Sequence, residues 1–195
     1  MALRLGLIAD VHAELERLQA ALDVLDSQGV VQIVCAGDVV EKGKDGDAVV
    51  QLLQTRAIPC VMGNHDHDVI DNQLWWLEHG SQDHPAVRDR LLAAETISYL
   101  KSLPRTLAAT WGGKRILLAH GTPWSAGVYL HPNSPPKLFK RVACEARADV
   151  VILGHTHLPM RAQVGSAWIV NPGSAAGGER GDSHTCAILS LPDCA

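Results

Sequence analysis

Short apolar runs that end directly in metal-competent polar residues constrain the fold of this chain more than any other feature. Leu3–Ala9 is the first such run, and Asp10 and His12 follow it at once. The same arrangement recurs after later runs, which predict strands at Val30–Ala36, Ala57–Met62, Lys114–Ala119 and Val150–Leu153. In open α/β sheets, ligands bind at the carboxyl ends of the strands. The pattern therefore predicts an α/β domain whose polar loops gather at one edge of its sheets.

Amphipathic helical segments separate the first three runs. Ala13–Gln28 repeats leucine at helical spacing and is followed by Gly29, a stop signal, and Asp47–Arg56 is a second helical segment. This β-α-β-α-β order predicts a parallel sheet with right-handed crossovers.

The rest of the chain predicts more helices and two hairpins. Helices are expected at Asp68–Gly80, Pro85–Leu100 and Pro136–Ala148. Hairpins are expected to join Thr106–Trp111 to Lys114–Ala119 and Met160–Val164 to Ala167–Val170, and Thr185–Leu191 is a closing strand. Residues 121–136, rich in Gly, Pro and Ser, are expected to be loop. Together these elements predict two mixed sheets packed together with helices outside, in a single domain over residues 1–195.

Composition limits the partners that this chain can bind. Its 195 residues are 47% hydrophobic and 19% charged, which is normal for a globular domain. A formal net charge of −4 argues against a broad basic surface for duplex nucleic acid, since such binding depends on clustered Lys and Arg. We therefore expect a small substrate and no extended nucleic-acid surface, while homo-oligomerisation stays open.

Cysteine usage and the distribution of apolar residues predict the location of the protein. The five cysteines are scattered, form no C-x-x-C pair, and include Cys35 and Cys60 inside apolar runs, where buried reduced thiols are expected. The N-terminal apolar run is too short for a signal peptide, and no run of about 18 apolar residues occurs elsewhere. We therefore expect no membrane partner and a reducing cytoplasm.

The polar residues at the predicted strand ends form a ligand set for divalent metal ions. Each short motif alone is also compatible with an ordinary turn, so the argument depends on their occurring together. The set contains oxygen and nitrogen donors and no thiolate, which favours Mn, with Fe, Ni, Co or Zn as alternatives. It is too large for one ion with an open position, and suits two ions that share a carboxylate, roughly 3.5–4 Å apart. Its members are Asp10, His12, Asp38, Asn64, His120, His155 and His157.

Five sequence blocks carry these residues. They are Asp10-Val11-His12, Gly37-Asp38 through Gly43, Gly63–Asp66, His120-Gly121 and Gly154–His157. In this order they closely resemble the blocks of the calcineurin-like metallophosphoesterases, and most of all those of the small stand-alone bacterial and archaeal phosphodiesterases. The match runs from residue 3 to residue 174, and Arg180 resembles an arginine that follows the late turn Asn171–Ser174. The resemblance implies a four-layer α/β/β/α sandwich of two mixed sheets flanked by helices.

The resemblance also implies roles for the site residues. One ion would be held by Asp10, His12, Asp38 and His157, and the second by Asp38, Asn64, His120 and His155, so that Asp38 bridges them. A water or hydroxide that bridges the ions is the candidate nucleophile. His65, paired with Asp66, is the candidate for helping the leaving oxygen depart. Relatives often carry Tyr-Gly-Pro where this chain has Glu41–Lys44, which leaves the substrate preference open.

A metal-dependent phosphodiesterase that acts on a small nucleotide-like substrate with two divalent cations per chain is therefore the predicted function. The positive charge of two divalent cations exceeds the negative charge of the two ligand carboxylates. The site would therefore be positive, which implies an anionic substrate. A phosphomonoesterase or a dinucleotide polyphosphate hydrolase on the same site is the alternative enzyme. A metal-bound interaction scaffold is a third hypothesis, and the presence of His65 and Asp66 argues against it, since a scaffold needs no leaving-group acid.

Residues outside the motif blocks have weaker claims. Aromatic rings could stack on a nucleobase and basic side chains could contact a second phosphate, although packing and solvated charge are the alternative explanations. These residues are Trp75, Trp76, Trp124, Lys42, Lys44 and Arg180, together with His67 and His131, which adjoin predicted site loops.

Overall fold

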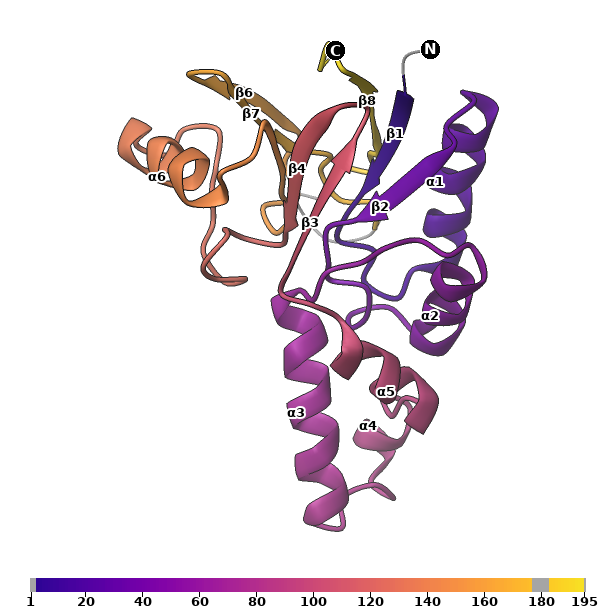
Figure 1. The fold of residues 1–195 in the computed structure, drawn as a ribbon. Coiled ribbons are helices and arrows are strands. Elements are labelled where there is room, and N and C mark those ends of the chain that lie inside the picture. Colours follow the sequence, from indigo (N-terminus) through magenta and orange to yellow (C-terminus); the bar gives the residue numbers. More distant parts are fainter. Residues whose placement is uncertain (1–2, 177–182, 195) are drawn as a thin grey trace.

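Two mixed sheets lie face to face at the centre of the fold in the computed structural model, which describes residues 3–176 and 183–194 (Figure 1). One sheet has the strand order β2-β1-β8, with β1 parallel to β2 and antiparallel to β8. The other has the order β3-β4-β5-β7-β6, with β4, β5 and β7 parallel and an antiparallel strand at each edge. The strands are β1 (Leu3–Ile8), β2 (Gln32–Cys35), β3 (Thr106–Trp111), β4 (Lys114–Ala119), β5 (Val150–Ile152), β6 (Met160–Val164), β7 (Ala167–Asn171) and β8 (Ala187–Leu191).

The core between the sheets follows from the alternation of side chains along each strand. Leu5 and Leu7 of β1 point to the same side and are fully buried against Leu118 of β4 and Ile152 of β5. Burying a side chain of this size stabilises the fold by about 1.5–3 kcal/mol. Alternate residues of the same strands face the outer helices, which explains why these runs are apolar on both faces.

Helices cover the outer faces of both sheets. Helices α1 (Leu15–Ser27) and α2 (Gly46–Thr55) pack on the three-stranded sheet, and α6 (Pro136–Ala146) packs on the five-stranded sheet (Figure 1). Leu18 of α1 lies in the first of these helix–sheet cores, and Val142 of α6 in the second. The predicted four-layer α/β/β/α arrangement of two mixed sheets flanked by helices is therefore confirmed.

Three further helices extend beyond the edge of the sandwich. These are α3 (Asn64–Glu78), α4 (Pro85–Arg88) and α5 (Ala94–Ser102), which lie together at one end of the molecule (Figure 1). Among the described residues, no helix combines the length and the apolar character that crossing a membrane would require.

The single helix predicted at Pro85–Leu100 is wrong, because residues 89–93 interrupt it. The Gln73 side chain of α3 donates to the carbonyl of Leu92 and accepts from its N–H, both at 2.8 Å. The N–H of Ala93 donates to the Asp47 carboxylate at 3.0 Å. Backbone groups that are paired in this way with side chains of other elements cannot also continue the helical ladder.

The strand predicted at Ala57–Met62 is also absent, and only an isolated bridge between Cys35 and Cys60 remains. Cys35 donates to the Pro59 carbonyl at 2.9 Å and accepts from the Val61 N–H at 3.2 Å. Proline has no N–H to donate, which limits how far the pairing extends. The segment nevertheless runs beside β2, so it delivers residues 63–66 to the same edge as residues 37–38.

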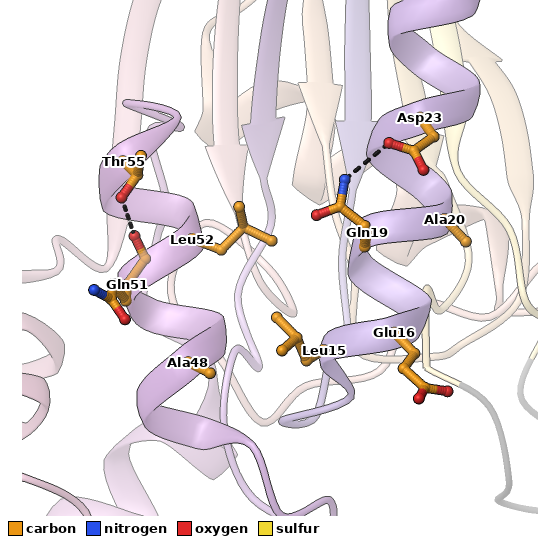
Figure 2. A pocket seen from close by; sticks show the side chains of 9 residues that line it. All are labelled: Leu15, Glu16, Gln19, Ala20, Asp23, Ala48, Gln51, Leu52 and Thr55. Atoms are coloured by element: carbon orange, nitrogen blue, oxygen red, sulfur yellow. Dashed lines mark hydrogen bonds between the residues drawn. The ribbon is translucent and has the colours of Figure 1, made fainter.

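A surface groove of about 650 Å³ lies between α1 and α2 (Figure 2). Figure 2 shows Leu15 and Leu52 pointing into it from the two helices, while Gln19 donates to Asp23 within α1 at 2.8 Å. Its lining contains no histidine, and none of the residues at the ends of the strands contributes to it. We therefore place the chemistry of the protein elsewhere.

Candidate metal centre

Both sheets deliver the predicted ligands to one edge of the sandwich. Asp10 and His12 follow β1, and Asp38 follows β2, in the first sheet. His120 follows β4, and the Gly154–His157 block follows β5, in the second sheet. All of these loops leave the carboxyl ends of strands that run in the same direction within their sheets. The structure therefore brings together residues that are up to 147 positions apart in the sequence, such as Asp10 and His157.

Asp10, His12 and His157 form the first group of candidate ligands. Each contributes one ligand atom, and these atoms all lie within 4.8 Å of one another. The Nε2 atoms of His12 and His157 are 3.1 Å apart, and His157 Nε2 is 3.4 Å from Asp10 Oδ1. This spacing places three donor atoms around a space that one cation can occupy.

Asp38, His120 and His155 form the second group, with ligand atoms again within 4.8 Å of one another. His120 Nε2 lies 3.1 Å from Asp38 Oδ2. The same Asp38 oxygen is 3.9 Å from His12 Nε2, which belongs to the first group. Asp38 thus lies between the two groups.

Several donor atoms of this cluster are buried without a hydrogen-bond partner among the described residues. They are Asp38 Oδ2, His120 Nε2 and His155 Nε2 of the second group. Asn64 Oδ1 and the other ring nitrogen of His12, Nδ1, are also buried without a hydrogen-bond partner. An unsatisfied buried polar group costs about 1–3 kcal/mol. The number of such groups here therefore indicates that this site binds a ligand. Oxygen and imidazole donors without thiolate suit divalent cations. The residues present therefore fit the metal ions that the sequence predicts.

Backbone groups orient these ligands. His120 Nδ1 lies 2.7 Å from the Ala36 carbonyl, which can only accept, so Nδ1 carries the proton and Nε2 faces the cluster. The Asp10 carboxylate accepts the N–H of His155 at 3.0 and 3.2 Å. Asp38 Oδ1 accepts the N–H of His65 at 3.0 Å. Each carboxylate thus has a fixed direction before any cation binds.

The ligand residues adopt an uncommon backbone conformation. Positive φ angles between 50° and 70° occur at five of them, and non-glycine residues seldom adopt such angles. Main-chain bonds stabilise this conformation: the N–H groups of Val11 and His12 donate to the Asp38 carbonyl at 2.9 and 3.0 Å. Strain of this kind concentrates at functional sites. The five residues are Asp10, His12, Asp38, His155 and His157.

Two glycines permit the close approach of the loops. A Cβ at Gly63 would lie 1.9 Å from Asp38 Oδ1, so no side chain fits there. Gly37 has a φ of +90°, and a Cβ on it would lie 2.8 Å from the Gly63 nitrogen. These positions explain physically why the G-D and G-N-H-D blocks begin with glycine.

Burial and charge shift the pKa values of the ligands in opposite directions. Burial raises the pKa of Asp10, although His157 and His120 oppose the shift. Burial also opposes ionisation of Asp38, but the neighbouring His120 brings the pKa of Asp38 below its usual range. Despite its own burial, His120 has a pKa raised to about 9 by Asp38. Metal binding requires neutral imidazole, so a cation bound here would have to displace the His120 proton.

The imidazoles of His12 and His155 are already neutral at physiological pH. Burial lowers the pKa of His12 to about 4, with Asp38 opposing the shift. Burial likewise lowers the pKa of His155 to about 4, and the charge of His120 adds to the effect. Neutral imidazole is the form that coordinates a metal.

His65 is paired with Glu41, and its expected pairing with Asp66 is wrong. His65 Nδ1 contacts Glu41 Oε2 directly. This bond raises the pKa of His65 and lowers the pKa of Glu41. Sequence reasoning missed Glu41, because its contact with His65 spans 24 positions and only the fold creates it.

Asp66 instead anchors the backbone of the loops that carry the candidate ligands. It is fully buried, and its carboxylate accepts the N–H groups of Val39, Val40 and Gly63 at 2.8, 3.0 and 2.9 Å. The bond to Gly63 caps α3, which begins at Asn64 and not at Asp68 as predicted. Burial, with a contribution from Asp38, raises the pKa of Asp66 to about 6.

Tyr129 is a site residue that sequence reasoning missed. Its ring stacks on His155 with centroids 3.8 Å apart, while 51% of the residue stays exposed. The signal that could have found it is an aromatic residue in the Gly- and Pro-rich loop after His120. It helps to line a cleft of about 220 Å³ whose other residues are Asp38, Lys42, His65, His155, Thr156 and His157.

The late turn supports the ligand loops from outside the cluster. The Asn171 side chain donates to the Gly154 carbonyl at 2.6 Å, and the Ser174 hydroxyl donates to the Asp10 carbonyl at 2.9 Å. Arg180, which the sequence associates with this turn, lies outside the described residues.

The remaining aromatic candidates lie in different environments. Trp75 is 54% exposed and stacks on His79, and Trp124 packs beneath Arg141 of α6. Trp76 lines a second cavity, to whose lining His65 also contributes. His67 and His131 lie outside the two ligand groups: His67 is exposed near Asp71, and His131 stacks with Tyr129.

Comparisons with known proteins agree with this geometry. The model of the calcineurin-like phosphoesterase superfamily domain matches residues 3–193. An uncharacterised protein of Methanocaldococcus jannaschii is 26% identical over 159 residues, which are 80% of this chain and 63% of that protein. The chain spans less than two thirds of the length of the curated relatives that it matches.

Solved structures share the fold. A metallophosphoesterase from Sphaerobacter thermophilus is 25% identical, with a TM-score of 0.76 over 100% of this chain and 85% of that one. A hypothetical protein from Pyrococcus horikoshii is 16% identical, with a TM-score of 0.77 over 97% of this chain and 88% of that one.

Proposed function

We propose that this chain, which belongs to the calcineurin-like phosphoesterase superfamily, is a metal-dependent hydrolase that cleaves phosphodiesters of a small nucleotide-like substrate with two divalent cations. The observation that carries the proposal is the position of Asp38 between two groups of ligand atoms, with its buried Oδ2 lying 3.1 Å from His120 Nε2 and 3.9 Å from His12 Nε2. A shared carboxylate of this kind is what a two-metal site needs.

The ligands divide between two ions in this proposal. Asp10, His12, Asp38 and His157 hold the first ion, and Asp38, Asn64, His120 and His155 hold the second. Two separate groups of donor atoms and the unpaired oxygen of Asn64 support the division. Mixed oxygen and imidazole donors favour Mn, with Fe, Ni, Co or Zn as substitutes.

When bound, the ions would supply Lewis acidity and lower the pKa of a nucleophilic water. The chain itself supplies the proton for the leaving oxygen. Glu41 engages Nδ1 of His65, so Nε2 is the nitrogen that can donate this proton. The carboxylate of Glu41 favours the protonated form of the ring, as a general acid requires. A scaffold would need no such pair, which argues against the interaction-scaffold hypothesis.

A diester fits the charge around the cleft better than a monoester. Apart from the histidines, Lys42 is the only basic residue among the described residues that line the cleft. A monoester dianion leaves one more negative charge to neutralise than a diester monoanion does. We therefore expect the diester to bind productively with fewer protein cations.

The test is a comparison of bis(4-nitrophenyl) phosphate with 4-nitrophenyl phosphate, which share a leaving group, on Mn-loaded protein. We expect a higher kcat/KM on the diester. A higher kcat/KM on the monoester would transfer the assignment to a phosphomonoesterase or a dinucleotide polyphosphate hydrolase.

We propose further that residues 1–195 form one catalytic domain and that the protein is located in the cytoplasm. All five cysteines are free, including Cys35 and Cys60, which are neighbours on paired segments, and this agrees with a reducing compartment.

A further inference from the structure

A second cavity adjoins the cleft over the metal ligands. Its volume is about 630 Å³, which is within the usual range for small-molecule sites. Lys42 and His65 line both the cavity and the cleft, so the two spaces meet at the proposed leaving-group acid. With the departing oxygen at His65, as the proposed function has it, a group attached to that oxygen would face this cavity.

One face of α3 forms a wall of the cavity. His65, Val69, Asn72 and Trp76 all line it, and their spacing of four, three and four residues places them in one row along the helix. The row spans about 16 Å between its first and last Cα atoms. The Cα–Cβ bonds of a helix tilt toward its N-terminus, which is the end of α3 that carries His65.

Main-chain bonds fix the opposite wall relative to the metal centre. The N–H of Gly43 donates to the His12 carbonyl at 2.9 Å, and the N–H of Asp45 donates to the Ala13 carbonyl at 3.0 Å. The same Gln73–Leu92 pair that divides α4 from α5 holds residues 89–92 against α3. The cavity is therefore largely preformed.

The lining combines an aromatic ring, an amide and cations. Val69, Leu91 and Leu92 provide apolar surface around the half-buried Trp76. Asn72, one turn before Trp76, has both a donor and an acceptor for the edge of a heterocyclic base. Aromatic stacking with amide contacts is the chemistry that recognises nucleobases.

Charge at the rim is mixed. Lys42, Lys44 and Arg90 are basic, and they face the acidic residues Glu41, Asp45, Asp47 and Asp89. Glu41 is engaged by His65, Asp47 accepts the Ala93 N–H, and Asp89 lies 3.7 Å from Arg88. Four carboxylates against three basic side chains give the lining no excess of positive charge, so it suits a neutral polar group next to the phosphate more than a second anion.

We propose that this cavity binds the leaving group of the substrate, and that the leaving group is a nucleoside whose base stacks on Trp76. Trp76 is then the residue that determines specificity, and Asn72 contacts the base edge. The inference rests on the proposed function for the position of the scissile phosphate, which sets His65 at the entrance of the cavity.

The primary test measures binding to metal-free protein by calorimetry, so that it does not depend on hydrolysis. Adenosine, guanosine, cytidine and uridine are titrated, with ribose as the probe that lacks a base. We expect at least one nucleoside to bind and ribose not to bind. Trp76→Ala should weaken that binding by roughly tenfold or more, as expected for loss of base stacking.

Trp75→Ala is the matched control. Trp75 is the neighbouring residue, is 54% exposed, and lines neither the cavity nor the cleft. It should bind nucleoside as the unmodified protein does. Trp76→Phe keeps a ring and should lose less affinity than Trp76→Ala. If Trp76→Ala does not fold, Asn72→Ala, a change at an exposed helix position, should still weaken binding.

A second readout is inhibition of bis(4-nitrophenyl) phosphate hydrolysis by nucleoside in Mn-loaded protein. The nucleoside that binds should inhibit competitively, and it should inhibit Trp76→Ala more weakly than the unmodified protein. Absence of binding by all four nucleosides, or equal losses in Trp75→Ala and Trp76→Ala, would overturn the inference. Hydrolysis without nucleoside binding would overturn it while leaving the proposed function intact. Nucleoside binding without any hydrolysis would contradict the proposed function and leave the cavity assignment standing.

Discussion

Replacing Asp66 by alanine should destabilise the fold more than it affects any chemical step. The Asp66 carboxylate is the only described acceptor for three buried N–H groups, on Val39, Val40 and Gly63. Each donor left without a partner costs about 1–3 kcal/mol. Burial raises the pKa of Asp66 to about 6, so removing the buried charge recovers part of this cost. We therefore expect a loss of about 3–5 kcal/mol, against a total stability of about 5–15 kcal/mol.

Urea unfolding of the metal-free protein at pH 7.5, followed by circular dichroism, measures this loss. Asp66→Asn keeps one oxygen for Val39 and Val40 and should lose about 1–3 kcal/mol through the bond to Gly63. Asp68→Ala, at an exposed position of the same helix, is the control and should change stability by less than about 0.5 kcal/mol. If Asp66→Ala is as stable as the unmodified protein but inactive, the structural role is refuted and Asp66 belongs to the chemistry.

Further predictions concern single residues of the site. In elemental analysis, Asp38→Asn should retain both ions less well than the unmodified protein does. His84 lies outside both ligand groups, so His84→Ala should retain them normally. Two tightly held ions and full activity in Asp38→Asn would show that Asp38 does not bridge the ions. His65→Ala should keep both ions and lose roughly 10²–10⁴-fold in kcat/KM on esters with poor leaving groups, and less on nitrophenyl esters. An equal loss across leaving groups of graded pKa would rule out the acid role. Tyr129→Ala should weaken metal affinity about tenfold in a competition titration. Tyr129→Phe should not, because phenylalanine keeps the ring that stacks on His155. Equal metal affinities of the two variants would show that the stack does not position His155.

Local patterns in the sequence predict most of the scaffold. β3 and β4 occur at the predicted residues, because two glycines with positive φ, Gly112 and Gly113, form the two-residue turn that a hairpin needs. Strand ends predict where Asp10 and Asp38 meet, because parallel strands leave their polar loops at one edge. These features depend on residues that are close together in the sequence.

Contacts between distant segments account for what the sequence does not predict. The side-chain bond between Gln73 and Leu92 divides a predicted helix, and no periodicity reveals it. His65 contacts Glu41 and not its sequence neighbour Asp66. Asp66 lies in the first turn of α3, where its side chain is buried in the core. Adjacency in sequence does not predict which carboxylate pairs with His65, since neighbouring residues of a helix point in directions about 100° apart.

Titration of Mn into metal-stripped protein, with activity on bis(4-nitrophenyl) phosphate and bound Mn measured at each addition, tests the two-metal centre most directly. The stripped protein should be inactive, and activity should rise until two ions are bound per chain, with Ni, Co or Fe restoring it only in part. Undiminished hydrolysis by protein verified to contain no metal, or full activity at one ion per chain, would contradict the two-metal account.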